Sequence, residues 1–346
     1  MSLCLGGENP VRLTDPIIRE GPQLKVDYVA CDSLGTRGMC VCIHTPDVVV
    51  TVDPGASLEP AHFPMPVERR NALLDEGDAA IRAACGRSQL VVISHYHLDH
   101  FSERRDPERY GGKTLFVKNH EGLPAKQSET ARAFHDVIDG LPKETIVADG
   151  RKFKFRKTQI SFSPPVWHGA EGAEPGQVIM TEVSWGKEKV IVTSDVGGPL
   201  EPATTDLIVN AKARTVVVDG YPTYMLGQFA TDHDLVRSIV NVCRIMAAPA
   251  VKTVILDHHM ARDYRYPAFF KLAYEKAKKL GKQFGTAAEI MGRTSAVLEG
   301  YQSYGPTRWH KWFPLEAADA RTVLERAVAD GKLDKEWPSL FDRWVV

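Results

Sequence analysis

Four side chains of the types that bind metal ions crowd into one six-residue segment of the 346-residue chain. They are His95, His97, Asp99 and His100, and they directly follow an apolar run at 91–93. Imidazole and carboxylate groups together suit zinc, iron or manganese. A polar cluster that closes a buried strand needs a physical reason, because polar groups buried without partners cost free energy. A metal site supplies that reason better than a surface turn does, and one such loop can serve two adjacent metals.

Further candidate ligands lie later in the chain, and each follows a run that predicts a strand. They are His168, Asp195, His258 and His259. The strands expected before them lie at 160–163, 190–193 and 253–256. Any one of these side chains alone would more often be a structural or surface residue. Their shared position, just past an apolar strand, favours one common site.

This ordered set resembles the signature of the metallo-β-lactamase-fold superfamily. The match consists of His-x-His-x-Asp-His at 95–100, then a single histidine, an aspartate and a late histidine. It covers roughly residues 25–300. The resemblance implies an α/β (α+β) fold, a four-layer αββα sandwich with two metals at one sheet edge. Segments such as Trp-His-Gly-Ala-Glu-Gly and Leu-Asp-His-His-Met-Ala-Arg are most similar to an uncharacterised, mainly archaeal branch of predicted metal-dependent hydrolases.

The resemblance also implies a role for each matching residue. Site one would take His95, His97 and His168, and site two would take Asp99, His100 and His258. Asp195 would bridge the two sites. We prefer His258 because it lies two residues beyond the last apolar strand residue, and His259 remains its rival. An aspartate at the bridging position, where true β-lactamases often have cysteine, argues against antibiotic hydrolysis.

Two more residues are candidates for supporting roles. Asp53 matches the superfamily's early Asp-x-Gly. The aspartate of that motif positions a metal ligand or a loop without binding the metal itself. The alternative is an ordinary turn aspartate before Pro-Gly. Tyr224 follows a predicted strand at 215–218 and could stabilise an oxyanion as a catalytic donor. The alternative is a packed aromatic ring.

A separate motif combines two thiols and an imidazole. Cys40, Cys42 and His44 lie at alternate positions, so they share one face of a predicted strand. A metal site there is one interpretation, and packed core thiols are the other. Farther along, Gly197 and Gly198 beside Asp195 favour a tight turn over phosphate binding, because no helix clearly starts there.

The leading functional hypothesis is a metal-dependent hydrolase with two divalent ions, zinc first and iron or manganese as alternatives. A metal-bridging hydroxide would attack an ester, lactone, amide or phosphodiester in a small-molecule substrate. Asp99 would orient this nucleophile or move a proton. The alternative is a diiron redox enzyme using O₂ or sulfur chemistry on the same fold. A metal-bound regulatory protein without turnover fits a full ligand set less well.

Composition and charge narrow the classes of function and the cellular settings that fit the chain. Lys and Arg number 43 and Asp and Glu 44, so the net charge of −1 argues against a dominant nucleic-acid surface. No window approaches 18 uninterrupted apolar residues, which predicts no transmembrane helix. The first residues lack a basic start followed by an apolar run, and the six cysteines lack paired spacing. A cytoplasmic setting is therefore expected.

Short β-branched runs and apolar periodicity predict the elements of the fold. Strands are expected at 25–30, 38–44, 48–52, 91–93, 114–118, 152–155, 160–163, 178–183, 190–193, 215–218 and 253–256. Helices are expected at 67–85, 128–139, 231–247, 267–281 and 315–330. Bursts of strands with helices between and after them predict two sheets with helices outside.

Three regions are expected: an arm at 1–24, the main domain at 25–300 and a tryptophan-rich extension at 301–346. The extension holds Trp309, Trp312, Trp337 and Trp344. So much aromatic area, together with the amphipathic helix at 315–330, predicts a packed segment. Its partner would be the body of the same subunit or a second copy in a homodimer.

Overall fold

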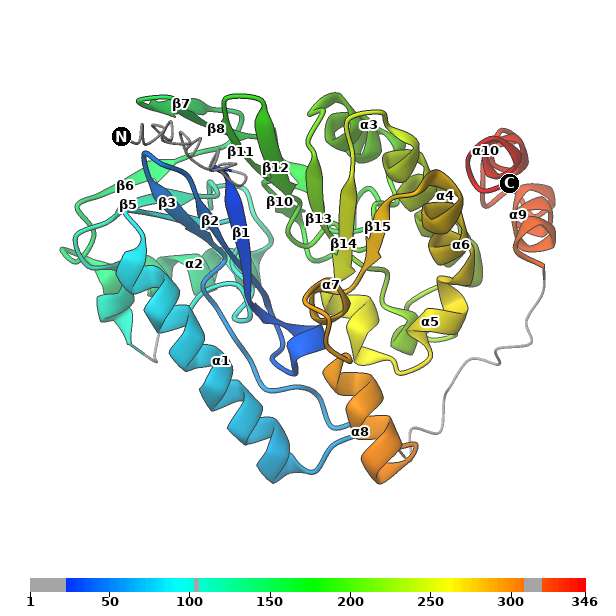
Figure 1. Ribbon diagram of the computed structural model, residues 1–346, viewed down its shortest axis with the longest axis horizontal. Coiled ribbons are helices and arrows are strands. Elements are labelled where there is room, and N and C mark those ends of the chain that lie inside the picture. Colours follow the sequence, from blue (N-terminus) through cyan, green and yellow to red (C-terminus); the bar gives the residue numbers. More distant parts are fainter. Residues whose placement is uncertain (1–22, 103–105, 308–318) are drawn as a thin grey trace, which may run out of the picture.

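The computed structural model describes residues 23–102, 106–307 and 319–346. Two central β-sheets face each other and helices lie on their outer sides (Figure 1). The first sheet contains, in spatial order, β1 (Lys25–Cys31), β2 (Met39–His44), β3 (Val49–Val52), β4 (Leu90–Ile93), β5 (Thr114–Val117) and β6 (Glu144–Val147).

The second sheet has seven strands and a different topology. Its spatial order is β15 (Gln283–Gly285), β14 (Thr253–Asp257), β13 (Thr215–Asp219), β12 (Glu188–Val192), β11 (Thr181–Trp185), β8 (Thr158–Phe162) and β7 (Lys152–Phe155). A short ribbon pairs β9 (Val166–Trp167) with β10 (Gln177–Val178). The strands β12 to β15 run parallel, as do β3 to β6.

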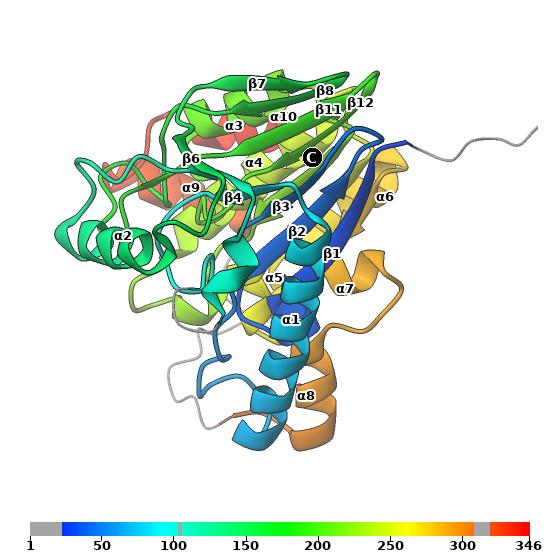
Figure 2. The same ribbon diagram turned by 90° about the vertical axis from the view of Figure 1, so that its left-hand side faces the viewer.

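Helices cover the outer face of each sheet (Figure 2). The first sheet carries α1 (Val67–Arg87) and α2 (Ala125–Ile138), and the second carries α3 (Pro202–Asn210), α4 (Asp232–Ala247) and α6 (Lys271–Leu280). Short elements complete the described fold: η1 (Asp32–Leu34), η2 (Pro107–Tyr110), η3 (Thr223–Met225), η4 (His258–Arg262), α5 (Tyr266–Phe269), α7 (Ala287–Ile290), α8 (Ala296–Tyr304), α9 (Ala320–Ala329) and α10 (Trp337–Trp344). The predicted four-layer αββα arrangement is confirmed.

Strand sequences explain these layers. In β13, Val216 and Val218 pack toward the helices, while Val217 between them packs into the space between the sheets. In β4 the same alternation sends Val92 between the sheets and Val91 toward α2. A strand covered on both faces needs apolar residues at every position, which is why these strands are continuous apolar runs.

Several elements differ from the prediction. The strand expected at 178–183 is interrupted and becomes β10 and β11, and the helix expected at 267–281 is divided into α5 and α6. The elements β6, β15, α3, α7, α8 and α10 were not predicted. Within the described ranges, no helix combines the length and apolar character that a membrane span requires.

The described part of the C-terminal extension packs on the main domain. Leu324 of α9 and Trp337 of α10 are buried in the same apolar cluster as the inner face of α4. Figure 1 shows α9 and α10 beside α4 and α6. The boundary expected after residue 300 falls inside α8. Trp309, Trp312 and residues 1–22 of the arm lie outside the described residues.

Candidate metal centre

The carboxyl ends of parallel strands from both sheets bring the candidate residues together. Asp53 follows β3, His95 follows β4, Asp195 follows β12 and His258 follows β14. Because parallel strands end at a common edge, residues far apart in the chain meet there. His168 follows β9 rather than β8, so the short ribbon positions it.

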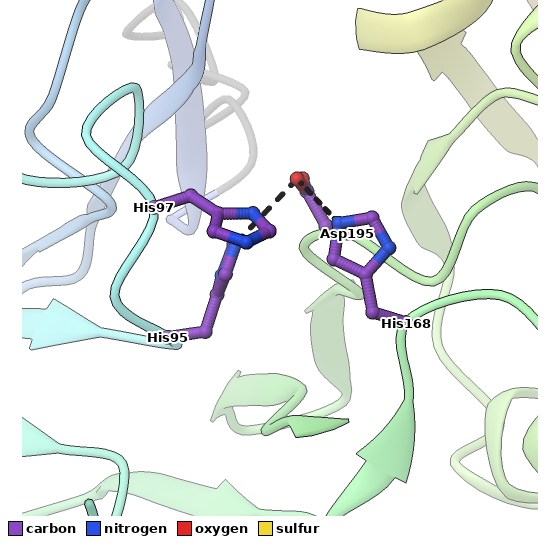
Figure 3. A group of neighbouring side chains, drawn as sticks. All are labelled: His95, His97, His168 and Asp195. Carbon is purple, nitrogen blue, oxygen red and sulfur yellow. Dashed lines mark hydrogen bonds and ion pairs between the residues drawn. The ribbon is translucent and has the colours of Figure 1, made fainter. Parts of the chain in front are cut away.

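Three histidines and one carboxylate form the first half of the centre. Donor atoms of His95, His97, His168 and Asp195 all lie within 4.8 Å of one another. Figure 3 shows these four side chains pointing toward one another, with His95 and His97 from one loop. Asp195 Oδ2 lies 3.2 Å from His168 Nε2 and 3.5 Å from His95 Nε2. One carboxylate oxygen thus faces this group.

The second half meets the other oxygen of the same carboxylate. Asp195 Oδ1 lies 2.9 Å from His100 Nε2 and 3.3 Å from His258 Nε2. His258 Nε2 is also 3.8 Å from Asp99 Oδ2. The residues Asp99, His100 and His258 are buried and form a separate group of three potential ligands. Asp195 therefore lies between two donor groups, one at each oxygen.

The far nitrogens of two histidines are bound to buried carboxylates. His100 Nδ1 lies 3.0 Å from Asp53 Oδ2, and His258 Nδ1 lies 2.5 Å from Asp32 Oδ2. A carboxylate at Nδ1 fixes the tautomer and leaves the Nε2 lone pair free for a metal. Asp53 thus contacts a candidate metal ligand, as its predicted supporting role requires. Asp32 has the same arrangement and was not predicted.

The donor atoms fit a bound cation. His95 Nε2 is buried and has no hydrogen-bond partner among the described residues. The Nε2 atoms of His100 and His258 lie 3.4 Å apart. With Nδ1 of both rings donating to carboxylates, two lone pairs would face each other across this gap unless a cation or proton lay nearby. Nitrogen and carboxylate oxygen donors suit zinc, iron and manganese.

Electrostatics in the centre favour positive charge. Burial and adjacent imidazoles lower the pKa of His97 to about 2, so this ring is neutral. Burial alone would lower the pKa of His100, but the carboxylates of Asp195 and Asp53 raise it to about 10. Burial also opposes ionisation of Asp195, yet the histidines beside it hold its pKa well below the usual range. A divalent cation would replace the proton on His100.

The two candidate late histidines have different surroundings. His258 is fully buried with Nε2 toward Asp195, whereas His259 is partly exposed and lies 2.8 Å from Asp219 through Nδ1. Even so, His259 belongs to a third group with Asp195 and His258. The geometry therefore favours His258 while keeping His259 beside the centre.

Two arginines lie beside the Asp99 carboxylate. Arg37 Nε donates to Asp99 Oδ2 at 2.8 Å, and Arg262 Nη2 lies 3.6 Å from the same oxygen. Arg262 also donates to Asp32 and, at 3.1 Å, to the hydroxyl oxygen of Tyr224. Tyr224 thus reaches the centre through Arg262. No sequence motif pointed to Arg37, and Arg262 was visible only as part of the segment that follows the late His-His pair.

Three of the strand ends have a backbone conformation that side chains rarely adopt. Asp53, Ser194 and His258 have φ values of 50°, 54° and 62°. Non-glycine residues in the left-handed region cost free energy and tend to cluster at functional sites. Here the turn lets Ser194 Oγ donate to Asp53 at 2.7 Å, beside the bridging Asp195.

Comparison with known proteins places the chain in a family. No protein-family model matches it. A UPF0282 protein of Metallosphaera sedula is 34% identical over 285 residues, covering 80% of this chain and 90% of that protein. A UPF0282 protein of Methanopyrus kandleri is 32% identical over 292 residues, covering 81% and 98%.

Solved structures with a similar fold include metallo-β-lactamase-fold proteins. YhfI from Bacillus subtilis has a TM-score of 0.45 at 15% identity, covering 76% of this chain and 96% of that one. Unliganded yeast PDE1 has a TM-score of 0.48 at 13% identity, with the same coverage of 76% and 96%. The expected relation to a mainly archaeal, uncharacterised family is confirmed by the curated relatives. The chain belongs to the UPF0282 family.

Proposed function

We propose that this protein is a dinuclear metal-dependent hydrolase that acts on a small molecule. The observation that supports it most is the position of Asp195, whose two oxygens face two different groups of nitrogen donors. A single-metal site would not need a second oxygen turned toward His100 and His258. This arrangement suits a carboxylate that bridges two cations.

Each half of the centre has a full set of donors for one ion. The ligands would be His95, His97 and His168 in the first site, Asp99, His100 and His258 in the second, and Asp195 in both. Two such cations would supply Lewis acidity and a water-derived nucleophile near neutral pH. The target would be an ester, lactone, amide or phosphodiester.

Protein groups around the second site have complementary tasks in this proposal. Asp99 is fixed by Arg37, and although burial opposes its ionisation, the adjacent cationic groups hold its pKa well below the usual range, so it stays a carboxylate that can orient a nucleophilic water by accepting a hydrogen bond. Tyr224 accepts a hydrogen bond from Arg262, which leaves its own hydroxyl hydrogen free to donate to developing negative charge. Tyr224→Phe should lower kcat by about 10²-fold while metal content stays unchanged.

Metal analysis with a substrate panel tests the proposal. Zinc-reconstituted protein should hold two metals per chain in this centre and hydrolyse at least one ester, lactone, amide or phosphodiester. Asp195→Ala should lose metal and turnover together, and Asp136→Ala on the exposed face of α2 should keep both.

Two other outcomes would overturn the proposed hydrolase function. A maximum of one metal per chain after careful reconstitution would contradict the dinuclear centre. Iron with a visible absorption band in aerobically purified protein, without hydrolysis of any panel substrate, would favour the diiron redox alternative, because the nitrogen and oxygen donors also suit iron.

A further inference from the structure

A second group of potential metal ligands lies on the first sheet, apart from the Asp195 centre. It consists of Asp27 on β1 with Cys42 and His44 on β2, and their donor atoms all lie within 4.8 Å of one another. His44 pairs with Val49, the first residue of β3, whereas the Asp195 centre lies beyond the last residue of that strand. The two groups therefore belong to different ends of β3.

The sheet itself positions the three side chains. Asp27 and Cys42 are direct partners in the antiparallel ladder of β1 and β2. His44 is two residues beyond Cys42, so it projects from the same face. β2 is hydrogen-bonded to β1 on one side and to β3 on the other. The sheet, rather than a loop, therefore fixes the directions of these side chains.

The contacts point to chelation rather than to a catalytic triad. His44 Nε2 lies 3.5 Å from Cys42 Sγ and 2.8 Å from Asp27 Oδ2. In a triad, the histidine uses opposite nitrogens for the nucleophile and for the carboxylate. Here one nitrogen faces both partners, so sulfur, nitrogen and oxygen converge on one point.

The separations suit a tetrahedral ion of the size of zinc. With bonds of about 2.0–2.3 Å, donor atoms around such an ion lie about 3.3–3.6 Å apart. The sulfur–nitrogen separation of 3.5 Å already falls in this range. The nitrogen–oxygen separation must open by about half an ångström. The Asp27 side chain is 52% exposed, so it is free to make this adjustment.

The surroundings keep the Cys42 thiol protonated until a cation displaces the proton, and they open toward solvent. Burial raises the pKa of the Cys42 thiol, but the hydroxyls of Thr51 and Ser88 beside it act in the opposite direction. Exposure increases from buried Cys42 through His44 to Asp27, which gives an ion a path to the sulfur. Arg87 lies 3.8 Å from Asp27, and its positive charge acts to lower the pKa of the Cys42 thiol.

We propose that Asp27, Cys42 and His44 form a separate binding site for one zinc-class divalent cation, with a fourth position open to water. Thiolate, imidazole and carboxylate donors together favour zinc over magnesium or calcium. Cys40, which shares this strand face, packs instead against Ile81 and Cys85 and takes no part. This site is independent of the proposed hydrolase centre.

Cobalt(II) titration of the full chain tests this site. A thiolate bound to cobalt(II) produces a near-ultraviolet charge-transfer band, and the ligands proposed for the Asp195 centre include no sulfur. We expect the band in the wild-type protein and in Asp195→Ala, and its loss in Cys42→Ser. Cys243→Ser, which alters another buried thiol on α4, should keep the band.

Substitutions at two partly exposed residues keep the test decisive if Cys42→Ser fails to fold. His44→Gln and Asp27→Asn retain the thiol and change side chains near the surface. Each should weaken cobalt binding at this site by at least about tenfold while the melting temperature stays near the wild-type value. No band at excess cobalt, or a band with unchanged affinity in both variants, would overturn the proposal.

Discussion

At the scale of single residues, the metal centre depends on which nitrogen of each histidine stays free. Asp32 binds Nδ1 of His258 and also accepts hydrogen bonds from the Gly38 backbone and from Arg262. The carboxylate is fully buried, so its orientation is fixed by these three partners. Asp32 therefore sets the direction in which His258 presents Nε2 to Asp195.

We expect Asp32→Asn to weaken binding of one metal by about 10–100-fold, because the amide no longer enforces the His258 tautomer. Competition with a chromophoric chelator would measure this change. Asp136→Asn, at an exposed position of α2, is the control and should bind both metals as the wild type does. Equal affinities in the two variants would show that Asp32 has only a structural role.

Single alanine substitutions distinguish the two late histidines. His258→Ala should lose one of the two metals of this centre, because its Nε2 lies 3.3 Å from Asp195. His259→Ala should keep nearly full occupancy, since His259 is partly exposed and, unlike His258, has no ion pair with Asp195 among the described residues. Elemental analysis of both variants side by side decides the question. The reverse pattern would exchange their roles.

The sequence could predict residues that follow apolar strands, and it could not predict partners that meet only across the fold. Asp53 was recognisable because it ends a strand in a familiar motif. Asp32 and His258 are 226 residues apart, and their contact exists only because η1 and η4 pack together. Arg37 belongs to the same class, because nothing near it in sequence indicates its bond to Asp99.

At the scale of elements, tight turns after strands hold the ligands in place. Gly197 follows Asp195 after one intervening residue, has φ of 65° and lies close to Gly169, the residue after His168. A Cβ at Gly197 would lie 2.8 Å from the Gly169 Cα. The turn therefore brings the segments of Asp195 and His168 into contact, as a tight turn rather than a phosphate loop.

We expect Gly197→Ala to reduce metal content, because the added Cβ must push these two segments apart. Gly186→Ala is a matched control: its φ of 60° imposes similar strain, but nothing lies within 4 Å of the new Cβ. Both variants should lose about 1 kcal/mol of stability from the left-handed backbone. Only Gly197→Ala should also lose metal, and equal metal content in the two would refute this reading of the turn.

Elements with strong periodicity or continuous apolar runs were predictable, and short elements that depend on tertiary contacts were not. The prediction found α1 and α4 close to their true ends. It missed β6, whose residues are mostly exposed and lack a buried pattern. It also missed α10, where a proline in the first turn hides the helix from a simple search for helix-forming residues.

At the scale of the whole molecule, the C-terminal helices extend the apolar core. Leu324 is fully buried and Trp337 is 2% exposed, and both belong to the cluster around α4. The Arg237 guanidinium lies 5.0 Å from the Trp337 ring centroid, which adds a cation–π contact between α4 and α10. The described extension therefore stabilises the second layer of helices from within one subunit.

We expect Leu324→Ala to lower the free energy of unfolding by about 2–5 kcal/mol and Trp337→Ala by about 3–5 kcal/mol. Both changes leave cavities between α4 and the C-terminal helices, so urea denaturation should show lower midpoints for both. Leu280→Ala, at a position 37% exposed on α6, should cost much less. Metal content should remain at the wild-type level in all three folded variants, because α9 and α10 contribute no proposed ligand. If both core variants kept wild-type stability but changed the mass in solution, the helices would serve a contact between subunits instead of the core of one.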